Sequence, residues 1–276
     1  MVSPWHFVTA AHCLTENFEE FDIVLRGQTY KVVEERPSNC YDVKTGLPNP
    51  ADVAIMVLES PIPDAVEGED FLKIWDGSTN TMKDQVFTLV GWGNSGGVGT
   101  SGDQDYDVFH VAKNKVNTIH DNMLVYTMDT EADGGEYLEG IGNSGDSGGP
   151  ALLRNPETGD WNIGGVKSNG QCCGWGSEAE YTRLGGLAYD WLIANIQYDE
   201  NGPAAAVPIE EGRCAAVWND PSNDGEDWEE MFIEWDQSPR DERVDFTEFR
   251  ENYDWYACSA EGARPMFDRL DKNGDN

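Results

Sequence analysis

Short runs of apolar and β-branched residues dominate the first two thirds of the chain. Clusters of Gly, Asn, Pro and Asp separate these runs, a pattern typical of strands joined by turns. Many short strands with this spacing indicate a mainly β fold of the sandwich or barrel type. The predicted strands are residues 21–35, 52–58, 85–92, 110–119, 123–128 and 161–167.

The hydrophobic period changes toward the end of this region. Apolar pairs spaced four residues apart over residues 185–196 predict a helix that closes a first domain, residues 1–198. Residues 199–213 contain Pro, Gly and an Ala run and are predicted to be a linker. Residues 214–276 are helical in pattern and rich in Trp, Phe, Asp and Glu, which predicts a small, acidic α-helical module.

Composition narrows the possible partners. The 276 residues include 18 Lys and Arg against 52 Asp and Glu, a formal charge of −34. This charge argues against a nucleic-acid partner, because phosphate neutralisation needs a basic face. Anionic membrane surfaces are disfavoured for the same reason. The longest apolar run near the middle, residues 53–58, is too short to span a membrane, so we expect no membrane insertion.

The strongest local signal is the run GDSGGP, in which Ser147 stands between glycines. Glycines allow a tight turn where the backbone approaches a ligand closely. The backbone N–H groups of Gly145 and Ser147 could then point together at a developing oxyanion. The run therefore predicts a nucleophilic serine on an exposed turn.

His12 and Asp52 lie in two further segments that suit catalysis. His12 belongs to the segment VTAAHC, which follows an apolar run with Trp5 and Phe7, and small neighbours would hold its imidazole in one rotamer. Asp52 begins the apolar strand 52–58, and a buried aspartate needs a donor such as a histidine N–H. Taken singly, each motif also fits a structural role, as a packed histidine, a strand cap or a flexible turn.

In chain order the three residues are His12, Asp52 and Ser147. Their contexts, SPWHFVTAAHC, DVAIMVL and GDSGGP, resemble those of the trypsin/chymotrypsin family of serine endopeptidases. The runs VGWG, GVKSNG and YTRL extend the resemblance, which covers about residues 3–197. The resemblance implies a mainly β, double antiparallel β-barrel fold. In it two six-stranded barrels pack together, and the three residues meet in the crevice between them.

The resemblance also implies the chemistry. Ser147 would attack a peptide carbonyl, His12 would take the hydroxyl proton and pass it to the leaving amine, and Asp52 would hold the imidazole. The N–H groups of Gly145 and Ser147 would form the oxyanion hole. Protein or peptide substrates follow, and no cofactor is expected for catalysis.

Four residues match positions that bind substrate in this family. Ile141, six residues before the nucleophile, would lie at the base of the primary pocket, which receives the side chain preceding the cleaved bond. An isoleucine there cannot pair with a charge. Gly170 and Ala179 match small pocket-wall positions, and Ser168 lies in the same segment as Gly170. We therefore expect cleavage after an uncharged, small or apolar residue.

The chain departs from the family pattern in three ways. The family has more chain before its histidine than the eleven residues found here, so we expect an N-terminal truncation and an incomplete first barrel. In the family, a free N-terminal ammonium pairs with the residue that corresponds to Asp146, and the counterpart of Cys13 bonds to an upstream cysteine. Asn143 also stands where the family usually has cysteine.

The six cysteines help to indicate whether the protein works in an oxidising or a reducing compartment. They are irregularly spaced and form no CxxC pair, which argues against a structural zinc site. Disulfides in an oxidising compartment, and therefore a secreted protein, are the favoured interpretation; reduced core cysteines are the alternative.

The acidic module contains two stretches that resemble EF-hand calcium loops. Asp271, Asn273 and Asp275 have the spacing of loop positions 1, 3 and 5. Asp236 and Glu248 bracket a second, degenerate loop that is one residue longer than usual. These stretches predict calcium binding, and a metal-free acidic helical hairpin is the alternative.

Two functions are consistent with these patterns. A serine endopeptidase with an EF-hand-like module is favoured, because all three catalytic residue types are present. The alternative is a catalytically inactive protease-fold interaction protein with a calcium-responsive tail.

Overall fold

The computed structural model divides the chain into two packed units. One unit contains Met1–Tyr41 and Pro50–Asn219, and the other contains Asp42–Asn49 and Asp220–Asn276. The second unit lies outside the residues that the structure describes. The described residues are 1–14, 22–41, 51–76, 82–100, 102, 108–120, 122–171, 173–186 and 188–209.

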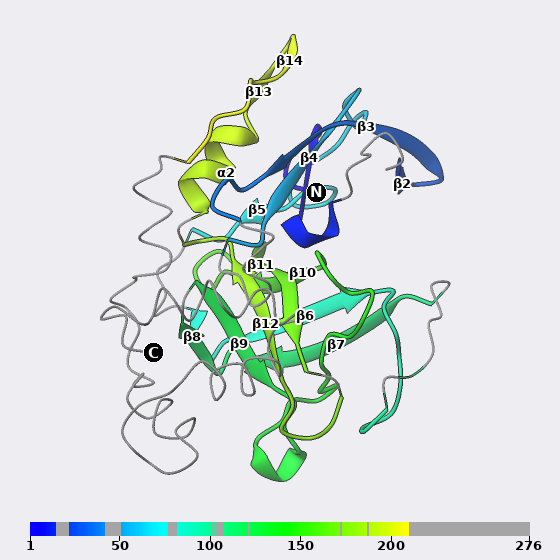
Figure 1. Ribbon diagram of the computed structural model, residues 1–276, viewed down its shortest axis with the longest axis vertical. Coiled ribbons are helices and arrows are strands. Elements are labelled where there is room, and N and C mark those ends of the chain that lie inside the picture. Colours follow the sequence, from blue (N-terminus) through cyan, green and yellow to red (C-terminus); the bar gives the residue numbers. More distant parts are fainter. Residues whose placement is uncertain are drawn as a thin grey trace, which may run out of the picture. The chain divides into compact units, whose positions relative to one another are not determined.

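The first sheet consists of four antiparallel strands: β1 (His6–Thr9), β2 (Asp22–Leu25), β3 (Gln28–Pro37) and β4 (Ala54–Leu58). Their order across the sheet is β1-β4-β3-β2 (Figure 1). Strand β4 is buried along its whole length, which explains its continuous apolar sequence. Arg26 and Gly27 have φ of 53° and 73° and make the tight turn between β2 and β3. The single run predicted over residues 21–35 is therefore a hairpin.

The second sheet has eight strands, and β11 lies near its middle (Figure 1). The main path runs β7-β6-β10-β11-β12-β9-β8 through antiparallel pairs, and β5 pairs in parallel with β11. The strands are β5 (Lys73–Ile74), β6 (Val86–Gly91), β7 (His110–Lys115), β8 (Thr118–His120), β9 (Met123–Thr127), β10 (Pro150–Arg154), β11 (Trp161–Gly170) and β12 (Glu178–Arg183).

One hydrophobic cluster joins the two sheets. It combines side chains of β4 in the first sheet with side chains of β11 in the second, and helix α2 (Tyr189–Asn195) packs on both. Burying this apolar surface holds the sheets together, so loops that leave β4 and β11 at this junction can meet. The buried members from these elements are Ile55, Val57, Ile163, Val166, Trp191 and Leu192.

After α2 the chain remains attached to the same unit. A small hairpin, β13 (Tyr198–Asp199) and β14 (Gly202–Pro203), is followed by hydrogen bonds from three side chains to the backbone. The first residues of the segment 199–213, which was predicted to be a linker, are thus hydrogen-bonded to the domain before it. The predicted domain boundaries themselves stay a prediction. The bonds are Arg36 Nη2 to Ala204 O (2.8 Å), Asn195 Nδ2 to Val207 O (2.8 Å) and Asn39 Nδ2 to Ile209 O (2.9 Å).

The predicted fold class is confirmed. The described chain is mainly β, with two curled sheets, four strands in the first and a closing helix where one was predicted (Figure 1). The described residues also include two 3-10 turns, η1 (Ala11–Cys13) and η4 (Glu131–Asp133). Within the same residues, no helix has the length and apolar character needed to cross a membrane. The predicted EF-hand-like module lies outside the described residues.

Candidate active site

The first sheet brings His12 and Asp52 together. Thr9 of β1 faces Ala54 of β4, so the residues just after β1 and just before β4 lie at the same end of the sheet. The backbone N–H of His12, in η1, donates to Oδ1 of Asp52 at 2.8 Å. The ring Nδ1 of His12 lies 2.7 Å from Oδ2 of the same carboxylate. Two contacts to one aspartate therefore fix the orientation of the imidazole.

Asp52 is fully buried, and the second sheet supplies a further donor to it. Ser168 in β11 donates from Oγ to Oδ2 of Asp52 at 2.6 Å. The carboxylate thus accepts hydrogen bonds from His12, which follows the first sheet, and from Ser168 in the second sheet, and these satisfy a buried anion. Ser168, assigned from the sequence to substrate binding, directs its hydroxyl at Asp52.

Ser147 lies on a turn that requires glycine on both sides. Gly145 and Gly148 have φ of 92° and 76°, in the left-handed region. The N–H of Gly148 donates to the carbonyl of Lys167, and the N–H of Lys167 donates to the carbonyl of Gly149, both at 2.8 Å. These two bonds attach the serine turn to β11.

The same turn contacts the strand that leads to His12. A Cβ atom added to Gly148 would overlap Oγ1 of Thr9 and lie 3.1 Å from the backbone N of Ala10. Ser147 itself is exposed. The three predicted catalytic residues therefore occupy one region, where the two sheets meet.

In this structure the imidazole contacts a thiol in place of Ser147. Among the described residues, the polar contact of His12 Nε2 is with Sγ of Cys13 at 3.6 Å, and Cys13 is a free, half-buried thiol. Burial lowers the pKa of His12, but its hydrogen bonds to Asp52 and Cys13 outweigh that effect and raise the pKa to about 10. The raised pKa favours the protonated ring, and only the neutral ring can accept a proton.

The backbone N–H groups beside the nucleophile are available to an anion. Within the described residues, neither Gly145 N–H nor Ser147 N–H has an acceptor, whereas the N–H of Asp146 between them donates to the carbonyl of Asn143 at 3.0 Å. Two unbonded N–H groups flanking a serine are what an oxyanion hole requires.

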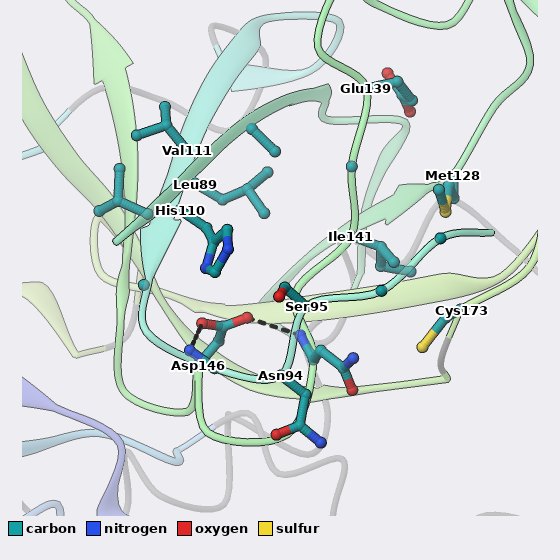
Figure 2. A pocket seen from close by; sticks show the side chains of 18 of the residues that line it. Leu89, Asn94, Ser95, His110, Val111, Met128, Glu139, Ile141, Asp146 and Cys173 are labelled. Atoms are coloured by element: carbon teal, nitrogen blue, oxygen red, sulfur yellow. Dashed lines mark hydrogen bonds between the residues drawn. The ribbon is translucent and has the colours of Figure 1, made fainter. Parts of the chain in front are cut away.

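Asp146 lines a cavity of about 220 Å³ (Figure 2). Its Oδ1 accepts from the N–H of Gly93 and its Oδ2 from the N–H of Asn143, each at 2.9 Å. Ile141 lines the same cavity and packs against the core of the second sheet. Two backbone donors thus bind the carboxylate that the resemblance pairs with an N-terminal ammonium.

Sequence reasoning missed one candidate functional residue, Lys167. It is buried in β11, and a Cβ atom added to Gly170 would lie 2.9 Å from its Nζ. Gly170 pairs with Ala179 across β11 and β12, so the ammonium lies beside the predicted pocket wall. One feature of the sequence could have pointed to this residue: Lys167 is the only charged residue between Asp160 and Glu178.

The predicted calcium ligands lie outside the described residues. Elsewhere, in the segments that are described, no group of three or more His, Cys, Asp or Glu side chains could hold a metal ion. The predicted ligands concerned are Asp236, Glu248, Asp271, Asn273 and Asp275.

The cysteine pairing is visible only in part. Cys40 and Cys173 each take part in a disulfide bond. Cys172, Cys214 and Cys258 lie outside the described residues.

Comparison with known families agrees with this geometry. A family model described as Trypsin matches residues 1–191, a span that includes His12, Asp52 and Ser147. A search among curated proteins finds no match.

Proposed function

The chain belongs to the trypsin family of serine-type endopeptidases, and on this basis we propose that it hydrolyses peptide bonds through His12, Asp52 and Ser147. One observation carries the proposal. His12 Nδ1 lies 2.7 Å from the buried carboxylate of Asp52. The turn that bears Ser147 packs against Thr9, the last residue of β1, three residues before His12. Protein or peptide substrates follow from the family.

In the proposed mechanism, Ser147 Oγ attacks the carbonyl carbon of the substrate while its proton passes to Nε2 of His12. Asp52 stabilises the imidazolium that forms, and the N–H groups of Gly145 and Ser147 bind the oxyanion. His12 then protonates the leaving amine, which breaks the peptide bond and leaves an acyl group on Ser147. Water, deprotonated by His12, releases the acid product and restores the serine.

The contact between His12 and Cys13 adds one requirement to this mechanism. Nε2 must exchange the Cys13 thiol for the Ser147 hydroxyl and lose its proton before it can act as a base. The ring can do this while keeping its Nδ1 contact to Asp52, because that contact lies on the opposite edge of the imidazole.

A fluorophosphonate probe tests the proposal directly, since it labels only an activated serine hydroxyl. Wild-type protein should be labelled at Ser147. Ser147→Ala should abolish labelling and lower turnover by roughly 10⁶-fold. Ser144→Ala, an exposed serine three residues away, is the matched control and should retain both. Full peptidase activity in Ser147→Ala would refute the assignment of the nucleophile.

Three further properties are proposed from the sequence and the family together. Disulfide bonding and a secreted location suit a protease of this family with six cysteines. Calcium binding by the acidic tail rests on sequence alone, and calorimetric titration of the full chain with calcium tests it. The inactive interaction protein remains the competing function, and absence of probe labelling at Ser147 would favour it.

A further inference from the structure

A buried ammonium group lies beside the predicted substrate pocket. Lys167 is only 4% exposed. Its Nζ donates to the carbonyl of Asn169 and lies 3.5 Å from the carbonyl oxygen of Glu180. The ring centroids of Tyr126 and Tyr181 are each 5.8 Å from Nζ. The ammonium therefore lies among β11, β12 and β9, on the inner side of the second sheet.

The side chain of Lys167 runs between two glycines. A Cβ atom added to Gly142 would lie 2.7 Å from Cε of Lys167, and one added to Gly170 would lie 2.9 Å from Nζ. At Gly142 the lysine is the nearest neighbour of the added atom, whereas at Gly170 the Cβ of Ala179 is nearer, at 2.5 Å. Gly142 follows the residue predicted at the base of the primary pocket, and Gly170 faces Ala179 in the predicted wall.

The same lysine is connected to the reacting groups. Its backbone forms the two 2.8 Å hydrogen bonds that attach Gly148 and Gly149 to β11. The next residue, Ser168, donates to Asp52. The ammonium therefore belongs to the segment that positions both the nucleophile turn and the catalytic carboxylate.

The positive charge forms no direct ion pair within the described part of the chain. Among the described residues, no carboxylate lies within ion-pair distance of Lys167 Nζ. Burial lowers the pKa of Lys167 to about 8, against the smaller, opposing effect of the Glu180 and Asp146 charges. At neutral pH the group is mainly a cation. A buried, unpaired charge is unfavourable, and an anion placed against it gains a strong, weakly screened interaction.

We propose that Lys167 makes the primary pocket selective for an acidic side chain, so that the protein cleaves after Glu or Asp. The inference rests on the proposed peptidase function and names its substrate class. The acidic side chain enters beside Gly170 and accepts hydrogen bonds from the ammonium, which has three donors and only carbonyl acceptors in the unbound protein.

This specificity differs from the one predicted from the sequence. That prediction rested on Ile141, which lines the cavity of Figure 2 and packs on the core. The sequence gives no sign of a pocket role for Lys167, because a lysine is ordinarily an exposed residue. The two interpretations name different substrates and can be separated by experiment.

Binding to the Ser147→Ala variant of the full chain tests the pocket without requiring catalysis. The probes are short peptides that differ only in a C-terminal Glu, Gln, Leu or Lys. The Glu peptide should bind about 10²-fold more tightly than the Gln peptide, because only Glu completes a buried charge pair. The measurement belongs at about 0.15 M salt, where the Debye length of about 8 Å screens repulsion by the acidic surface. Equal binding of Glu and Gln peptides, a preference for Leu or Lys, or no binding of the Glu peptide overturns the proposal.

Substitution of the lysine provides the second test. Lys167→Met keeps the length of the side chain and removes its charge, and it should abolish the Glu-over-Gln preference in binding and in kcat/KM. Lys73→Met is the matched control, because Lys73 is exposed and should leave the preference unchanged. If Lys167→Met does not fold, the comparison of Glu and Gln peptides on the Ser147→Ala variant still decides.

The two proposals fail in different ways. Tight, Lys167-dependent binding of the Glu peptide without hydrolysis of any peptide by the wild-type chain would refute the peptidase function and leave the pocket assignment standing. Hydrolysis that prefers uncharged residues would do the reverse.

Discussion

Ser168 donates a hydrogen bond to Asp52 across 2.6 Å, although 116 residues separate the two in the chain. The bond joins β11 of the second sheet to the carboxylate that orients His12 in the first. The geometry of the acid–imidazole pair therefore depends on the packing of the two sheets, and not on the first sheet alone.

Ser168→Ala removes this donor from a fully buried carboxylate. A hydrogen bond to a charged group contributes about 1.5–3 kcal/mol, so we expect kcat to fall roughly 10-fold or more. KM should change little, because the hydroxyl is directed at Asp52. Steady-state kinetics, normalised to the fraction of serine labelled by probe, measures the effect; an unchanged kcat would show that the bond does not position the pair.

Asp52→Asn keeps the shape of the side chain and removes its charge. The amide can no longer stabilise an imidazolium, and kcat should fall by roughly 10⁴-fold. Thermal unfolding of the variant serves as the control, since a folded protein with a large loss of kcat locates the effect in catalysis. A loss smaller than about 10-fold would contradict the proposed role of Asp52.

The pH dependence of activity should reflect the environment of His12. Burial lowers the pKa of His12, but the hydrogen bonds to Asp52 and Cys13 have a larger, opposite effect and raise it to about 10. A general base must be neutral, so kcat/KM should rise with pH, and its half-maximum should lie above 6.5, the ordinary pKa of histidine. A pH–rate profile with its midpoint at or below 6.5 would contradict this expectation.

Cys13→Ala tests the contribution of the thiol to that profile. Removing the thiol removes one interaction that raises the pKa of His12, so the midpoint of the pH–rate profile should move to lower pH. Activity at neutral pH should increase as a result, because a larger fraction of His12 is neutral. A midpoint that stays in place would show that Asp52 alone sets the pKa.

Gly148→Ala should misplace the serine turn. Gly148 has φ of 76°, and an added Cβ would overlap the side chain of Thr9. Gly99→Ala is the matched control, because Gly99 has φ of 83° but nothing within 4 Å of an added Cβ. Both variants carry about 1 kcal/mol of backbone strain, whereas only Gly148→Ala should also lose most of its peptidase activity and probe labelling. Equal activity of the two variants would contradict the tight contact.

The sequence predicted the parts of this fold that depend on local pattern. The apolar run of β4, the closing helix and the contexts of His12, Asp52 and Ser147 are all visible in short segments. The hairpin at Arg26 was not predicted. Arginine is not a typical turn residue, so Gly27 alone indicates the turn in the sequence.

Features that depend on strand register could not be predicted in this way. Ser168 reaches Asp52, and Lys167 reaches the pocket glycines, only because β11 lies between β10 and β12 in the folded sheet. Nothing in the local sequence around a lysine shows whether it points into a sheet or into water. The 3.6 Å contact between His12 and Cys13 likewise depends on the 3-10 turn that follows β1.

The hydrogen bonds to Ala204, Val207 and Ile209 attach the end of the described domain to earlier parts of the chain. Their side-chain donors are Arg36 and Asn39, which lie in and just after β3, and Asn195 at the end of α2. A ribosome releases the N-terminal end first, so Arg36 and Asn39 emerge long before their acceptors, whereas Asn195 precedes Val207 by only 12 residues. All three bonds are therefore present only once residue 209 has left the exit tunnel, and we expect a nascent chain arrested earlier to be more sensitive to proteolysis.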